Sequence, residues 1–183
     1  MIPDPAAETA TALLATAVRR LAHSQVLVIG DAMLDRYVYG AVDRISPEAP
    51  VPVLKVENEL AVPGGAANVV RNLAALRVAV AFVSIIGDDE AGGDLTGLIG
   101  SQPGVEPWLL VQGRRITTLK TRFVAQGRAV QGHQIMRADR EDSRPVHPKL
   151  IDRLLKISRD AIGATSVVIL SDYRKGEIGR AHV

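Results

Sequence analysis

The sequence predicts an α/β fold in which one parallel sheet lies between two layers of helices and a small β lid is attached. Short continuous apolar runs, such as QVLVIG (25–30) and SVVIL (166–170), are typical of parallel strands covered on both faces. Segments between such runs carry apolar residues at helical spacing. The stretch 114–137 instead has β-branched residues, glycine turns and no helical period, which predicts a separate sheet.

The first half of the chain alternates helix, strand and turn. Apolar residues from Ala10 to Leu21 recur every three or four positions and predict a helix near 5–22, followed by a buried strand at 25–31. Prolines in AVDRISPEAPVPVLKVENEL (41–60) restrict a strand there to a sheet edge or a flap. GGAANVVRNLAALR (64–77) predicts a glycine turn entering a helix, and VAVAFVSIIGDD (78–89) the next buried strand.

The second half begins with a helix at 88–100, weakened by glycines, and a strand at 105–111. We expect two or three exposed antiparallel strands from 114 to 137, which join the proline-rich strand in a lid within about 38–57 and 113–137. Helical spacing returns at 147–163, where Pro148 suits a first turn. SVVILSD (166–172) predicts the last buried strand.

Composition narrows the class of protein. The chain has 183 residues, 47% of them apolar, enough for one globular domain. It has no cysteine, which excludes disulfides, thiolate zinc sites and cysteine nucleophiles. A net charge of +2 and few aromatic side chains disfavour nucleic-acid binding. No apolar run is long enough to span a bilayer, so we expect a cytoplasmic protein with no membrane partner. The four histidines have no metal-ligand spacing.

Carboxylates follow the first buried strand in GDAMLDRY (30–37). Asp31 comes directly after the strand and Asp35 four residues later. Ligands of open α/β sheets bind at the carboxyl ends of strands, and carboxylates there accept hydrogen bonds from sugar hydroxyls. A cap on a helix or a turn explains Asp31 equally well.

A glycine pair forms the second candidate site, in PGGAANVVRNLAAL (63–76). Gly64 and Gly65 let the backbone approach a ligand, Asn68 can donate and accept, and the following helix offers free N–H groups. Tight strand-to-helix packing is the alternative. The stretch lacks the G-x-G-x-x-G spacing of dinucleotide sites and the lysine of a P-loop, so nucleotide binding here is disfavoured.

A third candidate site is SDYRKG (171–176), which follows the last strand. Asp172 and Lys175 would be supplemented from the lid by four charged residues, Lys120, Arg122, Arg137 and Asp139. Lysine and arginine converging on one cleft suit a phosphate carried by a substrate. Each of them alone could equally be a surface charge.

These motifs together resemble the ribokinase-like (PfkB) sugar kinases. VIGDAMLDRYVYGAVDRISPEAPVPVLKV, PGGAANVVRNLAAL, IGDDEAG and LSDYRKG are most similar to the N-terminal kinase half of the heptose-7-phosphate kinases, which are often fused to an adenylyltransferase. The likeness runs from about Val26 to Gly176, and RISPEAPVPV and SDYRKG are more specific to this branch than the glycine pair. The resemblance implies the N-terminal part of a three-layer αβα sheet with a small β lid.

The resemblance also implies an activity, a ligand set and a partner. The activity is transfer of the ATP γ-phosphate, with Mg²⁺, to the 1-hydroxyl of D-glycero-β-D-manno-heptose 7-phosphate, a step toward the lipopolysaccharide core. Asp31, Gly64, Gly65 and Asn68 would hold the sugar, while basic lid residues would hold its 7-phosphate. Lid strands would pair between subunits of a homodimer.

The chain departs from the family pattern in one large respect. The glycine-rich GAGD turn that supplies the base and the ATP site is absent, and AGGD (91–94) lies in a segment already matched to another family position. We therefore expect residues 1–183 to be the sugar-binding part of one kinase domain, inactive alone. A fragment of another sugar or nucleoside kinase and a non-enzymatic sugar-binding or dimerisation module are the alternatives.

Two smaller departures concern single segments. Arg77 stands where relatives usually turn with glycine, so we expect a different helix-to-strand turn there. EIGRAHV (177–183) breaks the pattern where a helix should begin, and it can be encoded by GAG ATC GGA AGA GCA CAC GTC, which reads like a sequencing adapter. We expect these seven residues to be a non-native tail.

Overall fold

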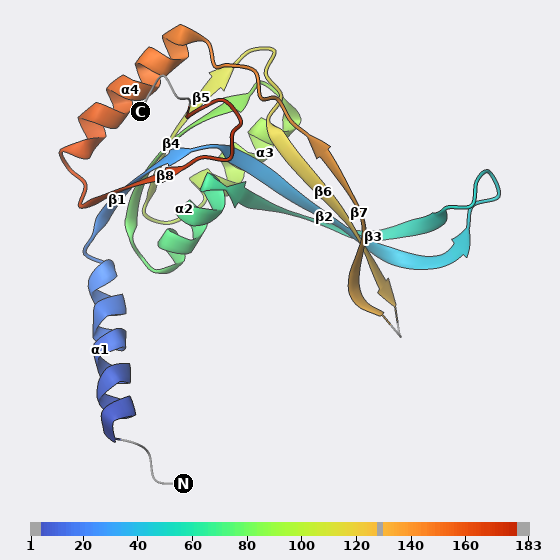
Figure 1. Ribbon diagram of the computed structural model, residues 1–183, viewed down its shortest axis with the longest axis horizontal. Helices are drawn as coiled ribbons and strands as arrows, with labels where there is room; N and C mark the ends of the chain where they lie inside the picture. The colour runs from blue at the N-terminus through green and yellow to red at the C-terminus, as the bar shows by residue number, and fades with distance from the viewer. Residues whose placement is uncertain (1–4, 128–129, 179–183) are drawn as a thin grey trace.

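The structure is a computed structural model that describes residues 5–127 and 130–178 (Figure 1). Its helices are α1 (Pro5–Leu21), α2 (Ala66–Ala75), α3 (Glu90–Gly100) and α4 (Pro148–Ile162). Its strands are β1 (Gln25–Gly30), β2 (Ala32–Ile45), β3 (Pro52–Gly65), β4 (Ala79–Gly87), β5 (Val105–Gln112), β6 (Thr118–Gly127), β7 (Val130–Arg140) and β8 (Val167–Ser171).

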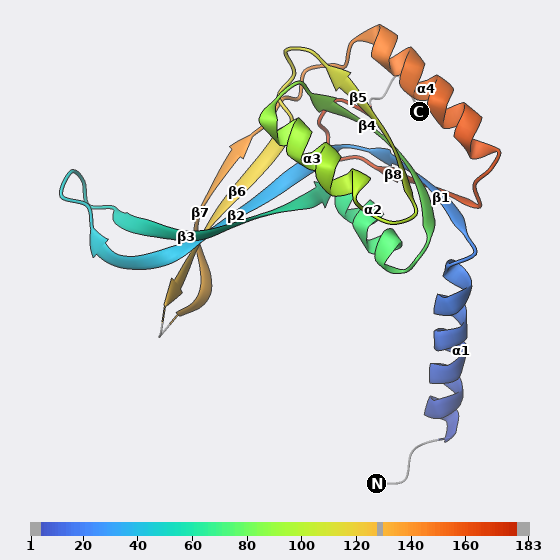
Figure 2. The same cartoon turned by 180° about the vertical axis from the view of Figure 1, so that it is seen from behind.

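The first sheet has the order β5-β4-β1-β8, and all its pairs are parallel. Helices α2 and α3 cover one face and α4 covers the other, as Figures 1 and 2 show from opposite sides. Three layers result, which confirms the predicted αβα arrangement. The carboxyl ends of these strands lie beside the second sheet.

The core is divided by the alternation of side chains along each central strand. Val26 and Val28 of β1 face α2 and α3, where Phe82 is fully buried. Leu27 and Ile29 face α4 on the other side. Because both faces are buried, the strands appear in the sequence as continuous apolar runs.

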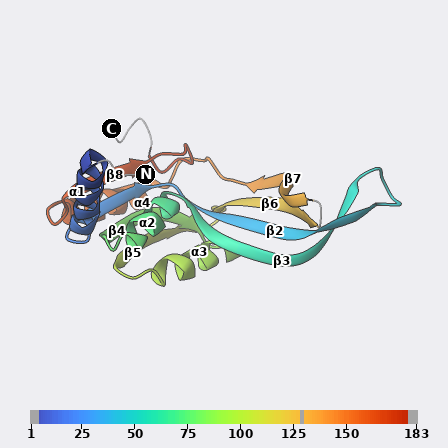
Figure 3. The same ribbon diagram turned by 90° about the horizontal axis from the view of Figure 1, so that it is seen from below.

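The second sheet, which we call the lid sheet, has the order β3-β2-β6-β7. Its pairs β2–β3 and β6–β7 are antiparallel, but β2–β6 is parallel. The proline-rich strand β3 is an edge strand, as predicted. Figure 3 shows the long strands extending away from the parallel sheet. Strands β2 and β3 reach 32 and 65, beyond the expected 38–57, so the lid begins directly beside β1.

Candidate functional site

Asp31 lies where the chain passes from β1 into the lid sheet, and only 2% of it is exposed. Its Oδ2 accepts hydrogen bonds from the backbone N–H of Tyr173 (2.7 Å) and of Lys175 (3.2 Å). Its carbonyl accepts from the N–H of Ala66 at 3.0 Å. Asp31 therefore ties the loop after β8 and the start of α2 to the end of β1. Among the described residues nothing donates to Oδ1, which leaves an acceptor for a ligand hydroxyl.

The glycine pair closes the lid against this point. A Cβ at Gly65, whose φ is 56°, would lie 2.6 Å from the carbonyl oxygen of Asp31. A Cβ at Gly64 would lie 2.5 Å from Oδ2 of Asp35. Tight packing thus explains both glycines without a ligand. Asn68 is half-buried in the first turn of α2, and no side chain caps that helix.

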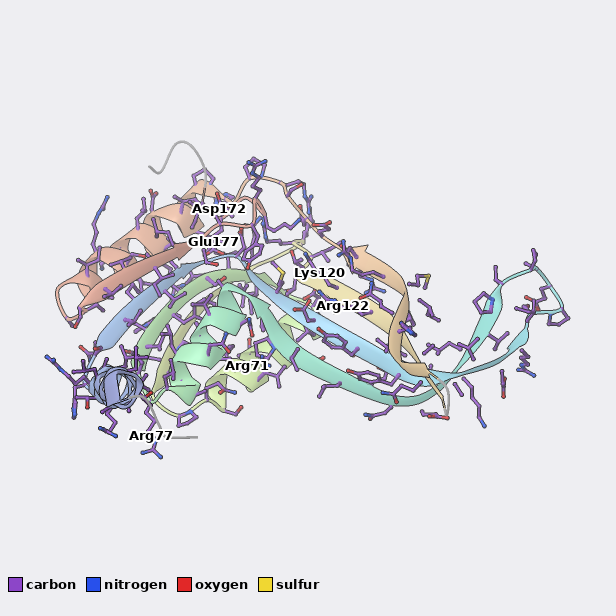
Figure 4. All side chains as sticks on the ribbon, turned by 60° about the horizontal axis from the view of Figure 1, so that its bottom comes forward. Arg71, Arg77, Lys120, Arg122, Asp172 and Glu177 are labelled. Carbon is purple, nitrogen blue, oxygen red and sulfur yellow. The ribbon has the colours of Figure 1, made fainter. Side chains whose placement is uncertain are left out.

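Strand register brings the predicted lid residues onto one face. Asp35, Lys120 and Asp139 form one cross-strand row. Tyr37, Arg122 and Arg137 form the row two residues further along each strand, so both rows point to the same side. We call these six side chains the lid face. Figure 4 labels Lys120 and Arg122 on the lid sheet and Asp172 on the loop after β8.

Ion pairs orient two of the three cations of the lid face, Arg122 and Arg137. Nη1 of Arg122 lies 2.6 Å from Oδ1 of Asp35, and this hydrogen bond raises the pKa of the Arg122 guanidinium. The guanidinium also lies over the ring of Tyr37, 5.2 Å from its centroid. Nε of Arg137 pairs with Oδ1 of Asp139 at 3.0 Å. With three cations and two carboxylates, the lid face keeps one excess positive charge.

The loop after β8 contributes its backbone more than its side chains. Asp172 is exposed, and its Oδ1 accepts from the N–H of Arg174 at 2.7 Å, which makes it a turn residue. Nζ of Lys175 pairs with Glu141 at the end of β7, while its N–H binds Asp31. The structure therefore brings the loop to Asp31, but it directs neither charged side chain to that carboxylate.

Several residues at the site were not singled out from the sequence. Arg115 is 7% exposed and donates to backbone carbonyls of three residues: Asp142, Arg144 and Lys175. Tyr37 belongs to the lid face through its register. In a strand at 32–39, Tyr37 points to the same face as Met33 and Asp35, so a strand signal there would have indicated Tyr37. No pattern in the sequence distinguishes Arg115 from the exposed arginines near it.

Glu177, the first residue of the expected non-native tail, is buried. Its Oε2 accepts from Oγ of Ser84 (3.0 Å) and from the N–H of Ile85 (3.1 Å), while Oε1 is buried and has no partner among the described residues. Burial raises the pKa of its carboxyl well above the ordinary value, and the nearby Asp31 adds to the shift. Residues 179–183 of the tail lie outside the described residues.

In the described part of the chain, no metal cluster is found, and the carboxylate of the AGGD stretch is paired with an arginine. Within 5–127 and 130–178, no cluster of three or more histidine and acidic side chains is placed to hold a metal. The AGGD stretch lies in α3, where Asp94 pairs with Arg36 at 3.0 Å, so that carboxylate is already engaged. None of the helices in these ranges is long and apolar enough to cross a membrane.

Comparison with known proteins places this chain in a family. The sequence profile of the pfkB family carbohydrate kinases matches residues 23–171, which include both sheets. The chain belongs to the pfkB family of carbohydrate kinases. Two relatives of this pfkB chain are bifunctional HldE proteins. That of Acidiphilium cryptum is 62% identical over 89% of the chain, and that of Paramagnetospirillum magneticum is 47% identical over 92%. The chain covers 32% and 33% of their lengths, about a third.

Solved structures support the fold of the pfkB chain. A carbohydrate kinase from Agrobacterium tumefaciens matches with a TM-score of 0.57 and 24% identity, over 80% of this chain and 45% of the other. A protein from Thermotoga maritima described as a possible 1-phosphofructokinase matches with a TM-score of 0.60 and 12% identity, over 85% and 47%. At these identities the likeness establishes the ribokinase-like architecture and nothing finer.

Proposed function

We propose that this chain is the sugar-binding part of a kinase that phosphorylates D-glycero-β-D-manno-heptose 7-phosphate at the 1-hydroxyl, in the cytoplasm. The observation that carries the proposal is the basic lid face, together with the buried Asp31 at the start of the lid sheet, whose Oδ1 has no donor among the described residues. Identity to the HldE proteins and the motifs RISPEAPVPV and SDYRKG support the heptose branch over other sugar kinases.

In this proposal the two ends of the substrate have separate binding groups. Oδ1 of Asp31 accepts from sugar hydroxyls, while the amide of Asn68 and the backbone at Gly64 and Gly65 complete the contacts. The 7-phosphate lies against Lys120, Arg122 and Arg137. Arg122 is held in place by Asp35 and Tyr37, so little side-chain entropy is lost when it binds a phosphate.

Phosphoryl transfer also needs a base near the acceptor hydroxyl and groups around the developing phosphate charge. In this proposal the described residues supply neither. We propose that the base and the groups that hold ATP and Mg²⁺ belong to the two thirds of the relatives' length that this chain does not span. Closure of the lid sheet over the sugar would exclude water as a competing acceptor. Pairing of lid strands between two copies would form a homodimer.

Calorimetry with two ligands tests the proposal. The chain should bind heptose 7-phosphate more tightly than the unphosphorylated heptose. Lys120→Met and Arg122→Met should each reduce binding of the phosphorylated sugar by about 30-fold, because each removes a charge-assisted contact worth about 2 kcal/mol. Affinity for the unphosphorylated heptose should not change. Lys149→Met, on the exposed start of α4, is the matched control.

Three outcomes would reassign the function. Equal affinity for the two sugars would show that the lid face does not bind the 7-phosphate. It would favour another sugar or a nucleoside as the substrate. Binding by this chain, together with no sugar phosphorylation by a relative of full length, would favour a binding or dimerisation module. Sugar phosphorylation by this chain alone would contradict the proposal that its base lies elsewhere.

A further inference from the structure

We propose that the segment Arg115–Thr117, which we call the junction, positions the two halves of the sugar site relative to each other. Arg115 fixes the loop that donates to Asp31. Thr117, through Asp89, fixes the strand that carries Lys120 and Arg122. The role of the junction rests on the proposed function, but its contacts can be tested without a ligand.

At one end of the junction, Thr117 and Asp89 form a closed set of hydrogen bonds. Oγ1 and the N–H of Thr117 donate to Oδ1 and Oδ2 of Asp89, at 2.6 and 2.9 Å. Asp89 also caps α3 by accepting from the N–H of Gly92 at 2.9 Å, and Oγ1 of Thr117 accepts from the N–H of Gly87 at 2.9 Å. The side chains of Asp89 and Thr117 thereby join the end of β4, the start of α3 and the start of β6.

Two glycines let these elements meet. A Cβ at Gly87 would lie 2.9 Å from the backbone nitrogen of Thr117 and would overlap the carbonyl oxygen of Arg115. A Cβ at Gly92 would lie 3.0 Å from Oγ1 of Thr117. The IGDDEAG motif therefore provides both the carboxylate and the space for the junction.

At the other end, Arg115 donates only to backbone carbonyls among the described residues. Nη1 donates to the carbonyl of Arg144 at 3.0 Å, and Nη2 donates to those of Asp142 (3.2 Å) and Lys175. A buried guanidinium without a carboxylate partner is costly unless its donors are satisfied. Here the donors hold Lys175, whose own N–H binds Asp31.

The junction directly precedes β6, the strand that carries Lys120 and Arg122. Thr117, which binds Asp89, directly precedes β6. It therefore lies three residues before Lys120 and five before Arg122. A rigid strand carries the position of its first residue to the following ones. The junction would thus set how far the phosphate-binding cations lie from the sugar-binding carboxylate, a distance that must match the substrate to within about 1 Å.

Variants at Thr117 test the lid end of the junction. Thr117→Val keeps the shape but loses both hydroxyl hydrogen bonds, whereas Thr117→Ser keeps them. We expect Thr117→Val to weaken binding of heptose 7-phosphate by about tenfold and to leave the unphosphorylated heptose unaffected. Thr117→Ser should restore the affinity. Asp89→Ser, which retains a helix cap but cannot reach Thr117, should behave like Thr117→Val, and exposed Asp88→Asn should not.

Variants at Arg115 test the other end by a different readout. Arg115→Met should abolish the hydrogen-exchange protection of the Tyr173 and Lys175 amides, while the amides of β1 stay protected. It should also weaken binding of both sugars. Its neighbour Arg114→Met is the control. Two results would contradict the proposed role of the junction. One is that the Tyr173 and Lys175 amides keep their hydrogen-exchange protection in Arg115→Met, and the other is that Thr117→Val weakens binding of both sugars equally. If the unaltered chain binds neither sugar, the proposed function fails, and exchange at Tyr173 and at the amides of β6 still decides whether the junction holds these elements.

Discussion

Arg77 ends α2 in a conformation that suits glycine better than arginine. Its φ is 62°, in the left-handed region where a Cβ meets backbone atoms. The N–H of Val78 donates to the carbonyl of Leu73, and the N–H of Arg77 donates to that of Ala74. These are the two hydrogen bonds of a Schellman motif, whose left-handed position is most often glycine. The turn therefore keeps glycine-like geometry at the expense of local strain.

Replacing this residue should stabilise the chain. Arg77→Gly is expected to raise the free energy of unfolding by about 1 kcal/mol, because glycine adopts this conformation without strain. Arg71→Gly, inside α2, is the opposite control and should lower it by about 1 kcal/mol. Figure 4 shows both side chains on the outer side of this helix and turn. Urea unfolding measures both, and equal effects of the two variants would contradict the strain at Arg77.

Glu177 should make stability depend on pH in an unusual direction. Its pKa is raised in the folded chain above the ordinary 4.5, so the folded state binds this proton more tightly than the unfolded state. The stabilisation is complete below pH 4.5 and declines by up to about 1.4 kcal/mol per pH unit as the pH rises through the folded pKa. Glu177→Gln should remove this decline.

Urea unfolding between pH 4 and pH 8 checks the Glu177 prediction, with exposed Glu106→Gln as the control. The same pH slope in the unaltered chain and in Glu177→Gln would show that this carboxyl is not buried in solution.

Among the elements, the lid sheet is the part that local sequence patterns predict least completely. The buried strands β1 and β4 and the helices were predictable because continuous apolar runs and helical spacing are local signals. The prediction of a buried last strand was wrong, because β8 is largely exposed although its sequence is a continuous apolar run. The start of β2 has no clear strand signal in the sequence, because residues 32–39 mix apolar and charged side chains. These residues also follow β1 after a single residue, Asp31. Its parallel pairing with β6 joins residues far apart in the chain, and no local signal specifies that register.

The candidate site was predictable to the same extent. Asp31 and the glycine pair stand next to strong strand and helix signals, so their proximity followed from topology. The lid face depended on the register between β2, β6 and β7. The sequence indicated a basic group for a phosphate but not the pairing of Arg122 with Asp35. Arg115 acts through the backbone carbonyls of distant loops, which residue type and spacing do not reveal.

The lid hairpin depends on a close approach at its bulge. The register shifts between Tyr39 and Gly40, where a Cβ would overlap the carbonyl oxygen of Lys55. Gly40→Ala should destabilise the β2–β3 hairpin by roughly 1–3 kcal/mol and speed amide exchange there. Gly113→Ala, where a Cβ would meet nothing within 4 Å, is the control. Unchanged exchange in Gly40→Ala would show that the strands separate at the bulge without cost.

At the scale of the whole molecule, the parallel sheet is covered unevenly. Strand β8 pairs with β1 alone among the described strands, so its other edge is open. Leu170 and Val167 are 61% and 51% exposed. A hollow of about 360 Å³ lies between α4 and β8 and is lined mainly by apolar side chains, Ile151 and Leu154 among them. An open strand edge beside an apolar hollow favours association with other chains.

We therefore expect β8 to form a second contact between copies of the chain, besides the pairing of lid strands proposed above. Leu170→Lys places a charge on the exposed edge strand and should raise the concentration at which association begins by roughly tenfold, because the charge must lose its water in the contact. Leu76→Lys, at an exposed leucine after α2, is the matched control and should leave association unchanged. Sedimentation velocity over a concentration series measures the onset. If both lysine variants associate like the unaltered chain, β8 is not the contact, and the exposed apolar residues of the lid hairpin become the surface to test.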